Sequence, residues 1–318
     1  MIKKIIFVNL IAIITIIVSL ELIAKTFKLS QLVGLDSNVT ISNDENFHSL
    51  KKNSKGIVFG KKVFIDSNGF RVPYENFHYT LDFTSIFFIG DSTTFGNGVI
   101  EEDSFVGKIR SKKKNINIYN SAVPGYNIYH HEKNFNKIGK FKNIEKIFYI
   151  FTLNDIIAVK QINELRDEKF LKINFLNYIN KFLRNKSYLY MYIKGVITDP
   201  SKRYFSYIIK AYNKEREFNS LKNYFSNLSK YSKSNNIYLK VIILPYEFQT
   251  RKNNCFGKNI LPQKIIKNIL ISTNIEFEDY TKFFCDNNNP KNLFYKFDPM
   301  HLSEKGHDLV FSKILENL

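Results

Sequence analysis

The chain has 318 residues, of which 44% are hydrophobic and 15% aromatic, and it carries a formal net charge of +18. This length and apolar content suit one large α/β domain with additions or two small domains, and they exclude an intrinsically disordered chain. Nucleic-acid binding is not indicated, because the lysines are spread along the chain and the longest run is only Lys112 to Lys114. A diffuse basic surface of this kind is a better match for an anionic lipid or glycan.

The first predicted element is a membrane anchor over residues 1–25. The segment Ile5 to Ala24 is apolar at all but four positions, and about twenty such residues cross a bilayer as one helix. Lys3 and Lys4 favour a cytoplasmic N-terminus, which predicts a single-pass protein with the rest of the chain outside the cytoplasm. A cleaved signal peptide followed by secretion is the alternative, although its apolar region would be unusually long.

Two further segments precede the main pattern. Residues 26–55 are polar and have no sustained periodicity, so they are predicted to be a stalk or a loosely packed lead-in. The globular domain is predicted to span residues 56–318. At its start, Gly56 to Val72 contains two short apolar runs and the turn dipeptide Asn68-Gly69, which predicts a small hairpin leading into the main sheet.

From Ser85 onward, short apolar runs alternate with polar, helix-like stretches. This pattern is typical of buried parallel strands covered by helices, and it predicts a three-layer α/β/α domain with about five parallel strands. The predicted strands are Ile86 to Ile89, Ile116 to Tyr119, Ile147 to Phe151, Ile237 to Leu244 and Ile275 to Phe277.

The crossover between the third and fourth predicted strands is too long for one helix. Its middle, residues 159–233, is rich in Phe, Tyr, Leu and Lys and is predicted to be a helical insertion. The sequence leaves open whether this insertion shapes a substrate cleft or only enlarges the core. The last segment, Ser303 to Leu318, predicts a closing amphipathic helix with Ser303 as its N-cap.

The two cysteines, Cys255 and Cys285, do not lie at metal-binding spacing, so a structural metal is not expected. In an extracytoplasmic domain they would form a disulfide, and two free, partly buried thiols are the alternative. His307 is interpreted as a packing or surface residue of the last helix. His130 and His131 have no acidic partner at metal-ligand spacing.

The first chemically informative segment is Gly90-Asp91-Ser92, which directly follows a predicted strand. In open α/β sheets, ligands bind at the carboxyl ends of strands, so Ser92 is placed where chemistry occurs. Alone, the tripeptide is more typical of a turn with a helix cap. The glycines nearby do not form a phosphate-binding loop, because neither G-x-x-x-x-G-K-[ST] nor a dinucleotide fingerprint is present.

The second segment is Asp298-Pro299-Met300-His301, just before the last predicted helix. A carboxylate three residues before a histidine can accept the Nδ1 proton, which leaves Nε2 to take a proton from a serine hydroxyl. Considered alone, such a pair is more often a surface or capping feature.

Two further residues suit the stabilisation of an oxyanion. Gly125 follows the second predicted strand and offers a backbone N–H, and Asn154 follows the third and offers an amide donor. Donors aimed at a developing negative oxygen are each worth about 3–4 kcal/mol in acyl-transfer enzymes. The simpler interpretations are a turn glycine and a turn-capping asparagine.

In combination, these residues resemble the SGNH/GDSL hydrolase family over residues 85–307. That family is named for four residues that correspond here to Ser92, Gly125, Asn154 and His301. The resemblance implies a flavodoxin-like sheet and a serine esterase mechanism that needs no metal or cofactor. It also implies an oxyanion held by the Ser92 N–H, the Gly125 N–H and the Asn154 side chain.

The chain departs from the family pattern in two places. Thr152 replaces the usual glycine two residues before Asn154, and Thr93 follows the Gly-Asp-Ser where the family name has leucine. Neither change removes a reacting group, but the first is expected to alter how the loop that carries Asn154 approaches the substrate. The stretch Asp66 to Arg71 also resembles the lead-in of anchored bacterial members.

The resemblance and the anchor together imply a membrane-bound serine esterase or acylhydrolase acting at the cell envelope through Ser92, His301 and Asp298. The expected substrate bears an ester on a carbohydrate or a lipid, with O-acetyl groups of an envelope glycan first and lipid or lipoprotein acyl esters second. The alternatives are an O-acyltransferase that uses the same triad and a non-catalytic glycan-binding or assembly module. The sequence indicates no oligomeric state.

Overall fold

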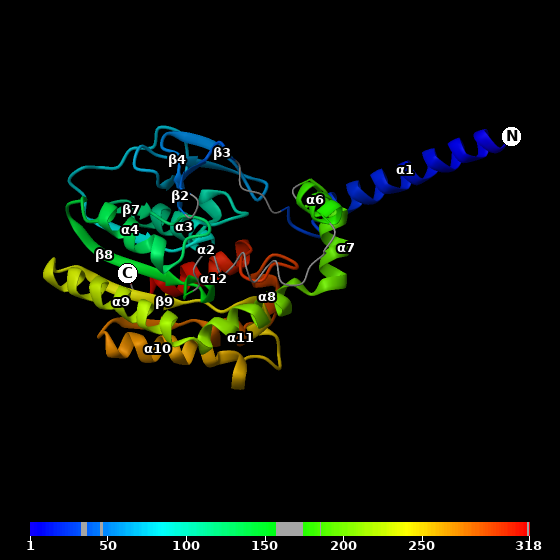
Figure 1. Ribbon diagram of the computed structural model, residues 1–318. Helices are drawn as coiled ribbons and strands as arrows, with labels where there is room; N and C mark the ends of the chain where they lie inside the picture. Colours follow the sequence, from blue (N-terminus) through cyan, green and yellow to red (C-terminus); the bar gives the residue numbers. More distant parts are fainter. Residues whose placement is uncertain (33–36, 45–46, 157–173, 185, 317) are drawn as a thin grey trace.

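The computed structural model describes residues 1–32, 37–44, 47–156, 174–184, 186–316 and 318. Figure 1 shows a layered body from which one long N-terminal helix projects. The strands are β1 (Thr40–Asp44), β2 (Phe47–Leu50), β3 (Ser54–Val58), β4 (Lys61–Ile65), β5 (Arg71–Val72), β6 (Ser85–Ile89), β7 (Asn117–Asn120), β8 (Ile144–Phe151), β9 (Tyr238–Ile243) and β10 (Glu276–Asp279).

Helices cover both faces of the main sheet. The α-helices are α1 (Ile2–Thr26), α2 (Ser92–Phe95), α3 (Phe105–Lys112), α4 (Ile128–Ile138), α6 (Asn174–Leu183), α7 (Tyr188–Thr198), α8 (Pro200–Ile208), α9 (Glu215–Ser234), α10 (Leu261–Ser272), α11 (Thr281–Cys285) and α12 (Glu304–Leu315). The 3-10 helices are η1 (Glu101–Asp103), η2 (Leu153–Ile156), η3 (Ile209–Asn213), η4 (Glu247–Thr250), η5 (Gly257–Ile260) and η6 (Pro290–Leu293).

The main sheet has the strand order β10-β9-β8-β6-β7-β5-β4-β3, and its β7-β6-β8-β9-β10 part is parallel. In chain order this parallel part runs 2-1-3-4-5, which is the flavodoxin-like arrangement. The prediction of a parallel α/β sheet is therefore confirmed. The third predicted strand, Ile147 to Phe151, begins too late, because β8 starts at Ile144. The charged residues Glu145 and Lys146 interrupt the apolar run at its start.

The two faces of β6 explain the three layers. Phe87 and Ile89 pack into a core shared with α4, α9 and α10, whereas Ile86 and Phe88 pack into a core shared with α3, α11 and α12. Alternate residues of a strand point to opposite faces, so a strand that is apolar throughout needs cover on both sides. The structure confirms the predicted closing helix as α12, with the Ser303 hydroxyl accepting from the Gly306 N–H.

An antiparallel extension lengthens the sheet beyond β7. The predicted turn at Asn68-Gly69 joins β4 to β5, and Gly69 has a left-handed φ of +76°. A second turn, at Phe59-Gly60, joins β3 to β4 and was not predicted. Phe59 also has a positive φ, +48°, which a bulky residue rarely adopts.

Regular structure also occurs within residues 26–55, the predicted stalk. Strands β1 and β2 pair there, and Val39 and Leu50 are buried in a core that includes Val63 and Phe95. Such short strands contribute too few apolar residues to show a period in sequence. The boundary of the globular domain stays a prediction, but the lead-in packs against the domain.

The segment between β8 and β9 contains α6, α7, α8, η3 and α9. Part of the predicted insertion, residues 159–233, lies outside the described residues. Of the described part, α8 and α9 contribute Phe205, Ile208, Leu221 and Phe225 to the core. In contrast, α6 and α7 stand away from the sheet (Figure 1), and α7 contacts α1.

The structure also bears on the predicted disulfide and on the predicted N-terminal helix. Cys255 and Cys285 are joined as a disulfide, with their Cα atoms 6.1 Å apart, which decides between the two alternatives left by the sequence. Helix α1 is long and apolar enough to cross a membrane, a property that an N-terminal signal sequence shares.

Candidate active site

The nucleophile candidate lies in a tight turn at the carboxyl end of β6. Ser92 is the first residue of α2, and the Asp91 carboxylate caps that helix by accepting from the Thr93 N–H at 2.8 Å. Gly90 is required here, because a Cβ atom would lie 2.1 Å from the Thr94 hydroxyl and 3.0 Å from the Ile150 carbonyl oxygen. The side chain of Ser92 is therefore fixed by a crowded turn.

The segment before α12 folds into a loop organised by Asp298. Its Oδ1 atom accepts from the Met300 N–H at 2.9 Å and from the His301 N–H at 2.8 Å. Because these bonds hold one oxygen against the backbone, Oδ2 is left facing the imidazole, and it lies 2.8 Å from His301 Nδ1. The loop thereby fixes the orientation of the His301 ring relative to Asp298.

The structure brings Ser92, Asp298 and His301 together, although Ser92 and His301 are 209 positions apart. His301 Nε2 lies 2.8 Å from Ser92 Oγ. A carboxylate can only accept, so Asp298 selects the tautomer with the proton on Nδ1, and Nε2 then accepts from the serine hydroxyl. This is the arrangement that a general base needs.

The charges of this pair shift both pKa values. Burial raises the pKa of Asp298, but the neighbouring His301 charge and the hydrogen bonds to the carboxylate together hold it below the ordinary value. Burial lowers the pKa of His301, and the Asp298 charge overcomes that effect and raises it above its ordinary 6.5. The imidazolium is therefore stabilised at the point where it would form during proton transfer.

Asn154 is held beside the nucleophile turn in η2, directly after β8. Its Oδ1 atom accepts from the Tyr246 hydroxyl at 2.6 Å, and its Nδ2 atom donates to Asp91 Oδ2 at 3.3 Å. These two contacts fix which end of the amide is the donor. Tyr246 was not singled out in sequence, although its place just after β9 puts it at the same edge of the sheet.

Thr152, the departure from the family pattern, occupies a polar cluster below this turn. Its Oγ1 atom lies 2.9 Å from Asp91 Oδ2, 3.0 Å from Asn154 Oδ1 and 3.2 Å from Asp155 Oδ1. Burial raises the pKa of both Asp91 and Asp155, and the Asp91 charge raises that of Asp155 further. One hydroxyl proton serves one acceptor at a time, so the Thr152 hydroxyl is shared among these three oxygens.

Gly125 lies in the loop after β7 and has a φ of +82°, a conformation that favours glycine. The Val123 N–H joins this loop to the nucleophile turn by donating to the Gly90 carbonyl at 3.2 Å. Within the described part of the chain, no hydrogen bond joins Gly125 directly to Ser92. His48, from β2, supports the loop, with Nε2 2.7 Å from the Pro124 carbonyl oxygen.

The antiparallel extension contributes two contacts that sequence reasoning missed. The Phe59 ring packs edge-on against the His301 imidazole, with centroids 4.8 Å apart. Arg71 is fully buried and donates to the carbonyl oxygens of Phe95, Gly96 and Val99, behind the nucleophile helix. In sequence, Arg71 only ends the Asp66 to Arg71 stretch, and nothing local indicates either contact.

Three other histidines have packing or capping contacts. His307 is buried on α12, where Nδ1 accepts from the Phe105 N–H, and burial lowers its pKa to about 3. His131 is likewise buried with its pKa lowered to about 3, and His130 completes a capping box with Asn127. Among the described residues, no group of three or more His, Cys, Asp or Glu side chains is arranged to hold a metal ion.

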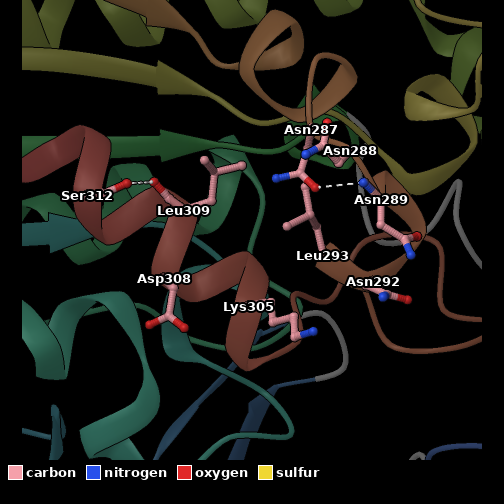
Figure 2. Close-up of a pocket in the computed structure, with 9 residues that line it drawn as sticks. All are labelled: Asn287, Asn288, Asn289, Asn292, Leu293, Lys305, Asp308, Leu309 and Ser312. Atoms are coloured by element: carbon pink, nitrogen blue, oxygen red, sulfur yellow. Dashed lines mark hydrogen bonds between the residues drawn. The ribbon is translucent and has the colours of Figure 1, made fainter.

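A surface pocket of about 410 Å³ lies elsewhere, between the loop after α11 and the outer side of α12 (Figure 2). Its polar lining offers amides, one ammonium and one carboxylate, and none of the site residues described above lines it. The lining residues are Asn287, Asn288, Asn289, Asn292, Leu293, Lys305, Asp308, Leu309 and Ser312.

Comparison with known proteins gives matches among solved structures. No protein-family model and no curated protein matches the chain. The chain is similar to the lipase/acylhydrolase from Enterococcus faecalis, with 14% identity, a TM-score of 0.44, and coverage of 74% of this chain and 94% of that chain. It is also similar to the acetyl xylan esterase AlAXEase (14% identity, TM-score 0.43, coverage 74% and 99%).

A further similar structure is a member of the lipolytic protein G-D-S-L family from Veillonella parvula, with 14% identity, a TM-score of 0.41, and coverage of 73% and 97%. These structures are of the kind that the sequence motifs resemble. Such low identities say nothing of activity, so the function of this chain rests on the side-chain geometry.

Proposed function

We propose that the chain is a serine esterase or acylhydrolase of the SGNH/GDSL type, with Ser92 as nucleophile, His301 as general base and Asp298 as its orienting acid. The observation that carries the proposal is the continuous relay from Asp298 Oδ2 to His301 Nδ1 and from His301 Nε2 to Ser92 Oγ, each step 2.8 Å long. A serine hydroxyl in contact with an oriented imidazole is the arrangement that activates a weak nucleophile.

In the proposed reaction, Ser92 Oγ attacks the ester carbonyl carbon while its proton passes to His301 Nε2. The tetrahedral intermediate collapses when His301 returns that proton to the leaving alkoxide, which departs as an alcohol. Water then attacks the acyl-serine while its proton passes to His301. His301 returns that proton to Ser92 Oγ, which releases the carboxylic acid and restores the enzyme. Asp298 stays ionised throughout, because its depressed pKa disfavours protonation.

The negative oxygen of the intermediate is assigned to donors from three segments: the Ser92 N–H, the Gly125 N–H and the Asn154 amide. Asn154 supports this role because Tyr246 and Asp91 fix its orientation, so an N–H of Nδ2 is presented without a rotational search. Such prearranged donors typically account for about 10²- to 10³-fold in kcat each.

The finer proposal is that the substrate is an O-acyl group, first an O-acetyl group, on a cell-envelope glycan. Two features support an extracytoplasmic site. Helix α1 is apolar enough to anchor the chain in a membrane, and Cys255 pairs with Cys285, as is usual for proteins in oxidising compartments. Lipid or lipoprotein acyl esters are the second substrate class.

An O-acyltransferase is the alternative within the same chemistry, because an acceptor hydroxyl would replace water in the second step. A non-catalytic glycan-binding or assembly module is the alternative from a different class. A Ser92→Ala protein that fully rescues a deletion strain would favour the module over the enzyme.

The direct test is hydrolysis of p-nitrophenyl acetate by the full-length protein in detergent micelles. We expect activity that falls by at least about 10³-fold in Ser92→Ala and in His301→Ala. Ser312→Ala, on the outer side of α12, is the matched control and should retain full activity. Activity that persists in the Ser92→Ala protein would contradict the serine mechanism.

A second arm separates the two reaction types. Adding a polyol acceptor and analysing its products by mass spectrometry distinguishes transfer from hydrolysis. Acylated polyol formed at the expense of free acid would identify a transferase. A folded wild-type protein with neither product would favour the binding module.

A further inference from the structure

Helices α6 and α7 carry an exposed apolar surface that the catalytic chemistry does not use. On α7, Ile193, Val196 and Ile197 are 47%, 59% and 76% exposed. Their i, i+3, i+4 spacing places them on one helix face. On α6, Tyr178 and Phe182 are 70% and 50% exposed and lie four residues apart.

The opposite face of α7 packs on the loop that holds the catalytic pair. Gly195 is buried so tightly against Phe297 that a Cβ atom would lie 2.3 Å from the phenyl ring. The ring of Tyr192 lies 5.8 Å from the same phenyl ring. Since Phe297 immediately precedes Asp298, α7 lies directly beside the Asp298 loop.

The end of α1 is fastened to the start of α7. The Glu21 carboxylate accepts from the Tyr188 N–H at 2.7 Å, the Leu189 N–H at 3.0 Å and the Ser187 hydroxyl at 2.7 Å. Beyond α1, the Ser30 hydroxyl donates to the Tyr188 carbonyl at 2.6 Å. The body is therefore docked on its anchor instead of hanging from a flexible stalk.

The position of Glu21 along α1 sets the level of α7 relative to a bilayer. Glu21 follows Lys4 by seventeen residues, which at the helical rise is about 26 Å, close to the hydrocarbon thickness. With Lys4 at one membrane surface, Glu21 lies at the other. The exposed residues Lys25, Lys28 and Lys186 surround this level and suit anionic headgroups.

We propose that α6 and α7 form a membrane-contacting platform, in which Ile193, Val196 and Ile197 enter the interface of the same bilayer that α1 crosses. Continuity with α1 and the surrounding lysines point to lipid as the occupant. The platform holds the Asp298 loop at the membrane surface through Phe297. This role is independent of the proposed esterase chemistry, because it follows from exposed residues and anchor contacts alone.

The natural chain contains no tryptophan, so one substitution gives a single fluorescent reporter. The experiment places Ile197→Trp full-length protein in nanodiscs with brominated acyl chains, which quench tryptophan by contact. Two matched variants replace other exposed isoleucines: Ile13→Trp on α1, as the membrane reference, and Ile271→Trp on α10, which is 66% exposed away from the platform.

We expect a several-fold loss of intensity in Ile197→Trp and Ile13→Trp and none in Ile271→Trp. Quenching confined to Ile13→Trp would overturn the proposal, as would an unquenched Ile13→Trp, since the platform requires α1 in the bilayer. A blue-shifted but unquenched Ile197→Trp would reveal a second copy of the chain on this face and would also overturn it. Adding Ser92→Ala to each variant should leave every result unchanged.

Discussion

Two carboxylates do similar work in very different parts of the molecule. Asp298 accepts from two backbone N–H groups and the imidazole of His301, and Glu21 accepts from two backbone N–H groups and the hydroxyl of Ser187. The first set joins positions 2 to 3 residues apart in one loop, whereas the second joins positions 166 to 168 residues apart. The same bonding pattern orients one side chain in the first case and docks a whole helix in the second.

The difference teaches how far each carboxylate's effect should reach. In the proposed reaction Asp298 orients the imidazole that takes the proton, so its loss should affect the rate of catalysis. Glu21 acts on where α7 lies, so its loss should affect local stability and leave the hydrolysis of a soluble ester intact.

The largest expected effect is on catalysis. Asp298→Asn should lower kcat for p-nitrophenyl acetate by about 10⁴-fold, because the amide favours the wrong imidazole tautomer. Steady-state kinetics measure the loss, and circular dichroism confirms that the fold is retained. A loss below tenfold would show that Asp298 does not orient His301.

The next effect concerns the cluster that joins the two loops of the site. Thr152→Val keeps the side-chain shape but removes the hydroxyl between Asp91 and Asp155, and it should lower the free energy of unfolding by about 1–3 kcal/mol. Urea denaturation measures the change. Thr84→Val, whose hydroxyl bonds Glu145 in an exposed position, is the control and should change stability little.

A smaller, local effect is expected where α1 meets α7. Glu21→Leu should speed hydrogen exchange of the Tyr188 to Met191 amides about 5- to 30-fold, because the N–H groups at the start of α7 lose their hydrogen-bond acceptor. Turnover of a soluble ester should stay at the wild-type level. Glu215→Leu, in the first turn of α9, is the control, and equal protection of the α7 amides in both variants would contradict the docking role.

The smallest expected effect is on the pH dependence of activity. His301 must be neutral to act as base, and its pKa is raised above 6.5, so kcat/KM should fall as the pH drops through a value above 6.5. In Asp298→Asn the raising charge is lost, and the acid limb of the residual activity should move to lower pH. In Glu21→Leu it should not move, and a displaced limb there would break the contrast between the two carboxylates.

The same contrast explains what the sequence predicted. Buried parallel strands have a continuous apolar pattern, so β6 and β9 were located closely, and their pattern of strand ends pointed to Ser92 and Asn154. Those two residues lie close together because the carboxyl ends of parallel strands share one edge, whereas His301 was found from its spacing to Asp298. Their roles remain part of the proposed function.

Contacts between distant segments left no local signal. Phe59 reaches His301 from a turn more than two hundred residues earlier, and Tyr246 reaches Asn154 from another strand end. The strands within residues 26–55 were missed because each is short and gains its stability from neighbours on the sheet. In sequence, Thr152 only departs from the family pattern. In the structure its hydroxyl contacts three polar side chains, those of Asp91, Asn154 and Asp155.

The contact between Gln31 and Phe59 bears on separation of the domain from α1. Gln31 Nε2 donates to the Phe59 carbonyl at 2.5 Å, and the Phe59 ring covers one edge of the catalytic imidazole. A protease that cuts between Thr26 and Leu29 would shed a domain that keeps this cover. A cut after Gln31 would remove this hydrogen bond, so the place of cleavage would decide whether the shed form keeps the Gln31 contact beside the imidazole.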